Sequence, residues 1–369
     1  MDRRESERIL EVISEVRAAG TRAAIATVVR VKGSAYRREG ARIIVREDGT
    51  HECLLSGGCL EPTVAAAAAR VIATGEPVIA SYDLEEDSLL GLGIGCSGAV
   101  DIRIERVEDD PVTRAWLQVL ERAEAAVLVT PLAGSTGRLV VSPNGAVVGD
   151  LSNPELVPRA IARAHARMAA SFPASGTEQV GEAELFFELS EAPPKLVIFG
   201  AGPDAGPLAN LAGDAGFAVT VVDVREAFLT AERFPRATLV SAHFSHFPER
   251  LRLDAQTHVV VMNHHLERDQ ESLGFALASD APYIGLLGPR SRYQKLLSGL
   301  RKQGYAPGDA TLSRVRSPIG LSLGAESPEE IAVSILGELL AFRRGFDGGF
   351  LNGRESSLHR PDAIRSIAR

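Results

Sequence analysis

The apolar residues of the first hundred positions alternate between helical and strand-like spacing. They recur at every third or fourth position over residues 4–18, which predicts an amphipathic helix. An alanine-rich stretch over residues 59–73 has high helix propensity and predicts a second helix. Runs rich in β-branched residues predict four strands, over residues 23–31, 42–45, 78–82 and 99–107. We therefore expect residues 1–108 to form one compact α+β module.

The following section, residues 109–190, mixes helical and strand-like patterns. It predicts helices or strands over residues 111–125, 126–130, 139–149, 155–169 and 184–189. We interpret it as an extension of the first module, because about 80 residues with a single hairpin bury little apolar surface alone. No internal repeat is expected. The Glu-Ala-Pro-Pro segment at 191–194 predicts the end of this domain, since paired prolines do not fit inside a helix or a central strand.

From residue 195 onward, short apolar strands alternate with helical segments, which is typical of parallel βαβ units. We therefore predict an α/β protein. An N-terminal α+β domain, residues 1–190, precedes a C-terminal Rossmann-like domain with a doubly wound parallel sheet over residues 195–345. The glycine-rich, polar residues 346–369 are expected to form a poorly ordered tail.

Composition narrows the class of protein. The 369 residues carry 40 basic and 48 acidic side chains without charge blocks, which argues against nucleic-acid binding. No apolar run approaches the roughly 18 residues of a membrane span, and the charged first twenty residues do not resemble a signal peptide. Three cysteines cannot all pair with one another, so a disulfide framework is excluded. We expect a cytoplasmic protein with reduced thiols and no membrane span.

A glycine turn follows the strand expected at 195–199 and opens a helix. Gly200-Ala201-Gly202-Pro203 begins a G-x-G-x-x-A pattern, and Asp223 stands 23 residues after the first glycine. This spacing matches a dinucleotide-binding fingerprint, in which the glycines admit a pyrophosphate and the acid bonds a ribose. Asp223 favours NAD over NADP, although Arg225 leaves NADP open. The turn is equally consistent with a Rossmann fold that binds no dinucleotide.

Two glycine-rich loops each carry a cysteine. Ser56-Gly57-Gly58-Cys59 leads to Glu61 at the start of the expected helix, where amides and the helix dipole favour a thiolate. Cys96 stands among glycines that would let a ligand lie against the backbone. Two such thiols suit a thiophilic metal or a persulfide, or else serve as small buried hydrophobic side chains. Their spacing does not match a zinc site. Cys53, in an apolar strand, is expected to contribute to packing.

Other charged groups are candidates for ligand contacts. Glu61, Arg37 and Arg38 would grip an anion beside Cys59, or would simply be solvated. The pair His264-His265 follows a predicted strand at the sheet edge where α/β folds place ligands, and is equally typical of a surface loop.

Taken together, these segments resemble the xanthine dehydrogenase accessory factors of the XdhC/CoxI family, from about residue 10 to residue 345. The resemblance rests on residues 33–41, 56–61, 91–98, 200–202, 285–290, 318–321 and 324–331. Members of this family bind molybdenum cofactor and protect it while a cysteine desulfurase replaces an oxo ligand by sulfur. They then deliver the cofactor to an apo molybdenum hydroxylase such as xanthine dehydrogenase or CO dehydrogenase.

The resemblance implies a cofactor chaperone in which Cys59 and Cys96 contact molybdenum or its sulfur. We assign Cys59, Cys96 and Glu61 as candidate catalytic residues, and we expect a homodimer. The residues expected to bind molybdenum cofactor or NAD(P) are Ser56, Gly57, Gly58, Gly200, Ala201, Gly202, Pro203, Asp223 and His264.

The sequence departs from the family pattern in its C-terminal half. The departures are Ala205, Asn263, Arg316 and Ser322, where the family has glycine, threonine, histidine and aspartate. Two alternative functions therefore stay open. One is an NAD(P)-dependent oxidoreductase, which would lack a Tyr-x-x-x-Lys pair or other hydride-transfer constellation; the other is a nucleotide-sensing regulatory protein.

Overall fold

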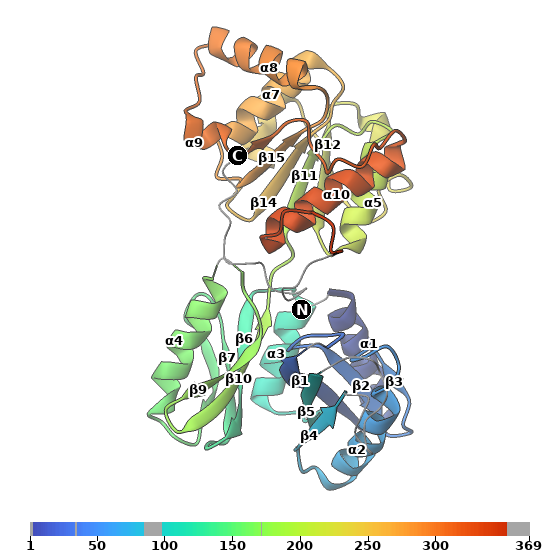
Figure 1. Ribbon diagram of the computed structural model, residues 1–369, viewed down its shortest axis with the longest axis vertical. Coiled ribbons are helices and arrows are strands. Elements are labelled where there is room, and N and C mark those ends of the chain that lie inside the picture. The colour runs from blue at the N-terminus through green and yellow to red at the C-terminus, as the bar shows by residue number, and fades with distance from the viewer. Residues whose placement is uncertain (1–2, 34, 85–97, 171, 353–369) are drawn as a thin grey trace. The chain divides into compact units, whose positions relative to one another are not determined.

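The computed structural model describes residues 3–33, 35–84, 98–170 and 172–352 (Figure 1). The chain divides into two compact units, Met1–Ala192 and Pro193–Arg369, and the division falls inside the Glu-Ala-Pro-Pro segment. Cys96, and the expected tail from residue 353 on, lie outside the described residues. Within these ranges no helix combines the length and apolar character that crossing a bilayer requires.

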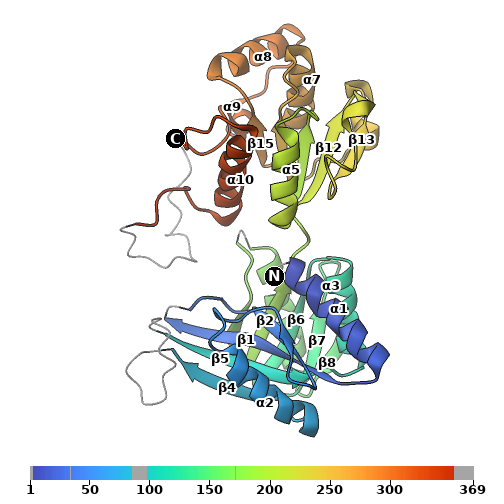
Figure 2. The ribbon, with the colours of Figure 1, turned by 90° about the vertical axis from the view of Figure 1, so that its right-hand side faces the viewer.

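The first unit begins with a five-stranded antiparallel sheet that lies between two helices (Figure 2). Its strands are β1 (Ala23–Gly33), β2 (Arg42–Arg46), β3 (His51–Glu52), β4 (Val78–Asp83) and β5 (Gly98–Arg106), in the sheet order β3-β2-β1-β5-β4. Successive side chains alternate between the two faces. Ala24 and Ile43 pack against α2 (Glu61–Thr74), whereas Ala23 and Ile44 pack against α1 (Arg3–Ala19).

The remainder of the first unit forms a second antiparallel sheet with its own hydrophobic core. The strands are β6 (Ala126–Ala133), β7 (Gly137–Val141), β8 (Val147–Leu151), β9 (Gly176–Val180) and β10 (Ala183–Ser190), in the sheet order β8-β7-β6-β10-β9. Val129 and Leu139 pack against α4 (Leu156–Met168), and Leu128 packs against α3 (Pro111–Glu121).

The two halves of the first unit repeat one topology. Each consists of a helix, three strands, a helix and two strands, and each sheet places its third, second, first, fifth and fourth strands in that order. The layers correspond as well, since Ile25 and Ile44 pack against α1 as Leu128 and Val140 pack against α3. The expectation of no internal repeat is therefore wrong, because the duplication is carried by strand order and apolar pattern.

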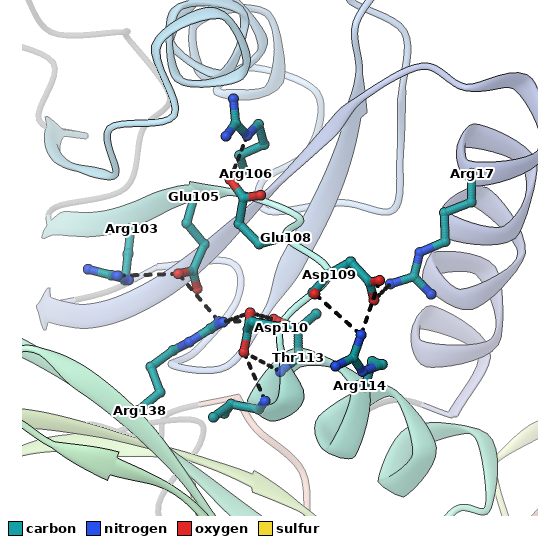
Figure 3. A network of polar contacts seen from close by, with 11 residues as sticks. Arg17, Arg103, Glu105, Arg106, Glu108, Asp109, Asp110, Thr113, Arg114 and Arg138 are labelled. Atoms are coloured by element: carbon teal, nitrogen blue, oxygen red, sulfur yellow. Dashed lines mark hydrogen bonds and ion pairs between the residues drawn. The ribbon is translucent and has the colours of Figure 1, made fainter.

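A polar network joins the two halves where the chain passes from β5 to α3 (Figure 3). Asp110 caps α3 by accepting hydrogen bonds from the amides of Val112 (2.8 Å) and Thr113 (3.0 Å). The same carboxylate pairs with Arg138 of β7 (2.8 Å), and Arg138 also approaches Glu105 of β5 at 3.6 Å. This arginine therefore connects the end of the first sheet to the second.

The second unit is built on a six-stranded parallel sheet. Its strands are β11 (Lys195–Phe199), β12 (Ala218–Asp223), β13 (Thr238–Ser241), β14 (Thr257–Val261), β15 (Tyr283–Leu286) and β16 (Val315–Arg316). Their order, β13-β12-β11-β14-β15-β16, is the 3-2-1-4-5-6 order of a Rossmann fold. The predicted doubly wound sheet is thereby confirmed.

Helices cover both faces of this parallel sheet. One face packs against α5 (Ala205–Asp214) and α10 (Pro328–Arg344), and the other packs against α7 (Leu266–Leu277) and α8 (Arg290–Lys302). Because both faces are covered, the central strands are almost entirely buried. The short helical elements are η1 (Glu226–Phe228), η2 (Phe244–His246), α6 (Phe247–Arg250) and α9 (Asp309–Leu312).

Candidate functional site

The loop between β3 and α2, residues 53–60, is organised by the Ser56 hydroxyl. Ser56 Oγ accepts hydrogen bonds from the amides of Cys59 (3.1 Å) and Leu60 (3.0 Å), and it donates to Glu61 Oε2 (2.6 Å). Glu61 Oε1 accepts from the amides of Leu55 (2.9 Å) and Ser56 (2.8 Å). A hydroxyl and a carboxylate thus fix both ends of the loop.

Glu61 is buried, with 1% of its surface exposed, and its oxygens bond to this loop. Burial opposes the charge of the carboxylate. The hydrogen bonds from Ser56 and from nearby backbone amides outweigh that effect and hold the pKa of Glu61 below its ordinary value. The carboxylate proposed from the sequence as a catalytic group is an ionised anchor of the cysteine loop in this structure.

The sequence pattern predicted that Cys59 lies in the first turn of α2. In the structure it lies two residues before the helix. The helix begins at Glu61, because the amides of Cys59 and Leu60 donate to Ser56 Oγ. The carboxylate of Glu61, and not the thiol, therefore occupies the first turn of the helix.

The outer part of the loop is open to solvent. Gly57, Gly58 and Cys59 are all exposed, and a Cβ placed on either glycine would meet no atom within 4 Å. In the part of the chain that the structure describes, neither glycine amide takes part in a hydrogen bond. An oxygen-bearing ligand at this loop would find two amide donors next to a thiol.

The sheet topology brings other motif segments to the same end of the first sheet. β1 and β3 both run antiparallel to β2, so the cysteine loop starts at the end where β1 finishes. Gly33, the last residue of β1, pairs with Gly98, and Asp83, the last residue of β4, pairs with Ala99. The strands that flank residues 84–97, the segment containing Cys96, therefore open at this end, beside the 34–41 connection.

The two arginines considered as anion ligands are already paired within the chain. Arg37 Nη2 donates to Glu5 Oε2 (2.6 Å), and Arg38 Nε lies 3.3 Å from Glu39. An anion at the cysteine loop would have to compete with these carboxylates for either guanidinium.

Cys53 lies at the root of the cysteine loop in unusual surroundings. Its backbone is in the left-handed region (φ 72°), and its half-buried side chain packs against the apolar layers on both faces of the first sheet. Its Sγ donates to the carbonyl oxygen of Glu5 (3.8 Å). Burial, together with the nearby Glu5 carboxylate, raises the pKa of the Cys53 thiol to about 11.

In the second unit, the glycine turn after β11 packs against the loop after β14, at the switch point of the sheet. Gly200 has a φ of +112°, and a Cβ there would lie 2.5 Å from the carbonyl oxygen of Met262. A Cβ on Gly202 would lie 3.4 Å from the ring of His264. Ala201 is fully buried in the turn, whereas Pro203 is exposed. Backbone packing alone therefore requires Gly200.

The carboxylate of Asp223 is fully engaged inside the chain. One oxygen accepts from the Ala201 amide (2.8 Å) and from Arg225 Nη2 (2.8 Å), and the other accepts from Arg225 N (2.9 Å) and Nε (3.0 Å). These contacts outweigh burial and keep the pKa of Asp223 below its ordinary value. Four donors fill the four lone-pair positions of a carboxylate, so a ribose would have to displace Arg225.

His264 and Asp204 form a side-chain pair at the switch point. His264 Nε2 lies 3.0 Å from Asp204 Oδ2, and the backbone of His264 is in the left-handed region (φ 56°). Asp204 is the residue directly before α5, so it puts a negative charge beside the helix start at which a dinucleotide would bind its pyrophosphate. The sequence analysis identified His264 as a candidate and did not identify Asp204. The position of Asp204 inside the glycine fingerprint could have indicated it. His265 is exposed.

Sequence reasoning also missed Arg233. Its guanidinium donates to the carbonyl oxygens of Gly202 (2.8 Å) and Phe228 (2.7 Å). Beside it a shallow groove of about 950 Å³ runs between α5, η1 and the start of α10, with Pro203 and Val333 among its lining residues. No motif in the sequence marks this arginine.

Comparison with known proteins connects both units to one family. Residues 196–339 match the family model of the XdhC Rossmann domain, and residues 16–83 match that of the XdhC and CoxI family. A Bacillus subtilis protein, named as a probable subunit of xanthine dehydrogenase, is 35% identical over 336 residues, covering 87% of this chain and 93% of that protein. The chain belongs to the XdhC/CoxI family.

Two further XdhC/CoxI comparisons extend over both units. The Escherichia coli protein named molybdenum cofactor insertion chaperone PaoD is 24% identical over 337 residues, covering 91% of this chain and 88% of that protein. A solved structure from Bacillus halodurans, described as a xanthine dehydrogenase, is 30% identical with a TM-score of 0.75, covering 91% of this chain and 95% of that one. The family resemblance inferred from the sequence is confirmed.

Two of the departures from the XdhC/CoxI pattern have structural partners in this chain. Asn263 donates from its amide (2.9 Å) and from Nδ2 (3.1 Å) to Asp269 Oδ1, which ties the loop after β14 to α7. Arg316 Nη1 donates to the carbonyl oxygen of Ser313 (2.8 Å). Both substitutions are thus accommodated by local hydrogen bonds.

Proposed function

We propose that this protein binds molybdenum cofactor as cargo and inserts it into a molybdenum hydroxylase. Membership of the XdhC/CoxI family supports the coarse role of an accessory protein, and the likeness to a protein named molybdenum cofactor insertion chaperone supports the cargo. The client is an apo enzyme of the xanthine dehydrogenase or CO dehydrogenase type. A cysteine desulfurase supplies the sulfur that replaces an oxo ligand while the cargo is held.

The observation that carries the proposal is the open cysteine loop. Molybdenum is thiophilic, so the exposed Cys59 sulfur is a ligand of suitable softness. The amides of Gly57 and Gly58 are donors for an oxo group or for the anionic phosphate of the pterin. Glu61 and Ser56 hold these groups in place. Cys96 is proposed as the second thiol at the cargo.

Cofactor loading tests this proposal. The full-length protein is expressed in a host that makes molybdenum cofactor, and molybdenum and pterin are then measured in the purified protein. Wild type should carry both, and Cys59→Ala and Cys96→Ala should each lose at least about fivefold, which corresponds to roughly 1 kcal/mol of binding free energy. Ser152→Ala, in the corresponding loop of the second half, is the matched control and should load normally. Absence of cargo from wild type, or equal loading of wild type and the two cysteine variants, contradicts the proposal.

The Rossmann strand order and glycine turn favour a second candidate, an NAD(P)-dependent or nucleotide-sensing protein. The filled carboxylate of Asp223 and the position of Asp204 speak against it. We expect no saturable change in nicotinamide fluorescence when NADH or NADPH is titrated into the protein. Saturable binding that disappears in Gly202→Trp would instead support this second function.

A further inference from the structure

Arg30 of β1 pairs with Glu184 of β10, and two further ion pairs that cross between the halves of the first unit correspond to one another. Arg42, the first residue of β2, lies 2.9 Å from Glu188 of β10. Arg138 of β7 lies 3.6 Å from Glu105 of β5. Each half therefore supplies an arginine to a glutamate of the other half.

The strand registers make these two pairs equivalent. Glu105 stands opposite Ile25 of β1, and Glu188 stands opposite Leu128 of β6. Ile25 and Leu128 are themselves corresponding residues, packed against α1 and α3. Ile25 pairs with Ile44, which lies two residues after Arg42. Leu128 pairs with Val140, which lies two residues after Arg138. Reciprocal contacts of this kind are the pattern of a two-fold interface, here within one chain.

The two pairs differ in burial. The side chains of Arg42 and Glu188 are 2% and 7% exposed, whereas those of Arg138 and Glu105 are 21% and 25% exposed. A charge pair shielded from water holds its geometry more strictly, because either partner left alone would be an uncompensated buried charge.

The buried pair also leads to the cysteine loop. Arg42 Nε lies 3.7 Å from Glu5 Oε1, and the other oxygen of Glu5 accepts a hydrogen bond from Arg37 in the 34–41 connection. The carbonyl oxygen of Glu5 accepts from Cys53, at the root of the cysteine loop. A continuous path of contacts therefore runs from Glu188, in the second half, to both connections in the first.

Both connections reached by this path are longer than their counterparts in the second half. The first half joins β1 to β2 through residues 34–41, and the second half joins β6 to β7 through residues 134–136. The first half joins β3 to α2 through residues 53–60, and the second half joins β8 to α4 through residues 152–155. The second half thus keeps the fold without the long loops.

We propose that the second half of the first unit is the internal positioning partner of the cysteine loop, and that Glu188 is its positioning residue. Glu188 holds Arg42, Arg42 and Arg37 hold Glu5, and Glu5 fixes the roots of the two long connections. Where the loop binds cargo, a point that rests on the proposed function, the same path sets the geometry of the Cys59 thiol and the glycine amides.

Hydrogen exchange of the full-length protein tests this role without any cargo. The readout is the protection of the loop amides that bond to Ser56 and Glu61, namely those of Leu55, Ser56, Cys59 and Leu60. Glu188→Gln should speed their exchange at least about threefold. Glu105→Gln breaks the equivalent pair and should leave them unchanged. Glu188→Asp, which keeps a carboxyl group, should restore most of the protection.

A second readout separates this role from general stability and from the proposed function. Molybdenum loading should fall in Glu188→Gln and stay normal in Glu105→Gln. If the Glu188→Gln chain does not fold, Glu188→Asp should still give exchange intermediate between the wild type and a Ser56→Ala chain. Equal exchange in Glu188→Gln and Glu105→Gln overturns the inference. A wild type that carries no molybdenum overturns the proposed function and leaves the exchange result standing.

Discussion

Cys53 and Cys59 are six residues apart, yet their thiols have different surroundings. Cys59 is exposed, whereas Cys53 is half-buried and has a pKa of about 11. Only the thiolate reacts with iodoacetamide, so the raised pKa keeps Cys53 protonated and unreactive at pH 8. Reactivity should rise about tenfold per pH unit toward pH 11 and level off above it, because half of the folded thiol is ionised at its pKa of about 11.

This first prediction is measured by peptide-level mass spectrometry in a Cys96→Ser background. At pH 8 Cys59 should be alkylated at least about tenfold faster than Cys53, since a pKa of about 11 leaves only about one Cys53 thiol in a thousand ionised at that pH. In urea-unfolded protein the two rates should be similar. Similar rates in the folded protein would show that the burial of Cys53 does not protect its thiol.

Gly200 gives a second prediction at this scale. Gly200→Ala would force a Cβ to within 2.5 Å of the Met262 carbonyl oxygen, in a backbone that already has a φ of +112°. We expect it to lower the free energy of unfolding of the second unit by more than about 3 kcal/mol. Gly216→Ala is the matched control. Its φ is +88° and its surroundings are open, so it should cost only about 1–2 kcal/mol.

The measurement for Gly200 uses the position of the single tryptophan. Trp116 is buried in α3 of the first unit, so its fluorescence reports the unfolding of that unit. Circular dichroism and calorimetry report both units. Gly200→Ala should shift the unfolding transition of the second unit and leave the transition reported by Trp116 fluorescence unchanged. Equal effects of the two alanine substitutions would contradict the close approach at Gly200.

At single residues, the sequence predicted backbone conformation well and predicted the hydrogen-bond partners of side chains poorly. The spacing of Gly200 and Gly202 after an apolar strand required a tight turn, and the turn is present. The same spacing predicted that Asp223 forms a hydrogen bond with the ribose of a dinucleotide. Its carboxylate instead bonds to Arg225 and the turn, a choice among side-chain partners that residue order does not determine.

At the scale of elements, the junction between the cysteine loop and α2 depends on Ser56. Ser56→Ala would remove one donor to Glu61 and the acceptor for two amides. Because Glu61 is buried and ionised, the expected loss in the free energy of unfolding of the first unit is about 1–3 kcal/mol. Urea unfolding followed by Trp116 fluorescence measures it.

The control for Ser56 is a serine that caps a helix in the second unit. Ser327 forms a capping box with Glu330 at the first turn of α10, in the second unit. Ser327→Ala should cost about 1 kcal/mol there and leave the Trp116 transition where it is. A Ser56→Ala chain that unfolds like wild type would show that the hydroxyl does not organise the loop.

Long elements with a regular apolar pattern were predicted from the sequence, and short ones were not. The helix expected over residues 4–18 is α1, and the strand expected over residues 23–31 is β1. Three strands were not predicted: β3 and β16, which have two residues each, and the polar strand β9. None of them is long or apolar enough to show an alternating pattern. The start of α2 was misplaced because a side-chain hydroxyl, and not the helix pattern, engages the amides of Cys59 and Leu60.

At the scale of the whole molecule, the parallel sheet was predictable and the duplication was not. Regular alternation of strands and helices implies parallel βαβ units whatever the identity of each residue. The duplication of the first unit becomes plain once strand order and register are known. Ile25 and Leu128 correspond through the strands they pair with, and the sequence around them shares only an alanine two residues before and a threonine two residues after.

The interface between the duplicated halves gives the last prediction, which concerns pH. Burial raises the pKa of Glu188 above the ordinary value near 4.5, and Glu105 and Glu5 add to the rise while Arg42 opposes it. Folded protein therefore holds this proton at a pH where unfolded protein has released it. The sign follows: the stability contribution of Glu188 is fully present below the ordinary pKa and is lost as the pH rises through the raised value.

Urea unfolding of the first unit, followed by Trp116 fluorescence from pH 4.5 to pH 7.5, measures this contribution. Glu188→Gln cannot titrate, so its stability should fall less with rising pH than that of wild type. Glu105→Gln retains the titrating group and should keep most of the wild-type slope. Such a result would mean that the buried pair with Arg42 fixes the position of the halves without adding net stability, as desolvated ion pairs often do. Identical slopes in wild type and Glu188→Gln would show that folding does not raise the pKa of Glu188.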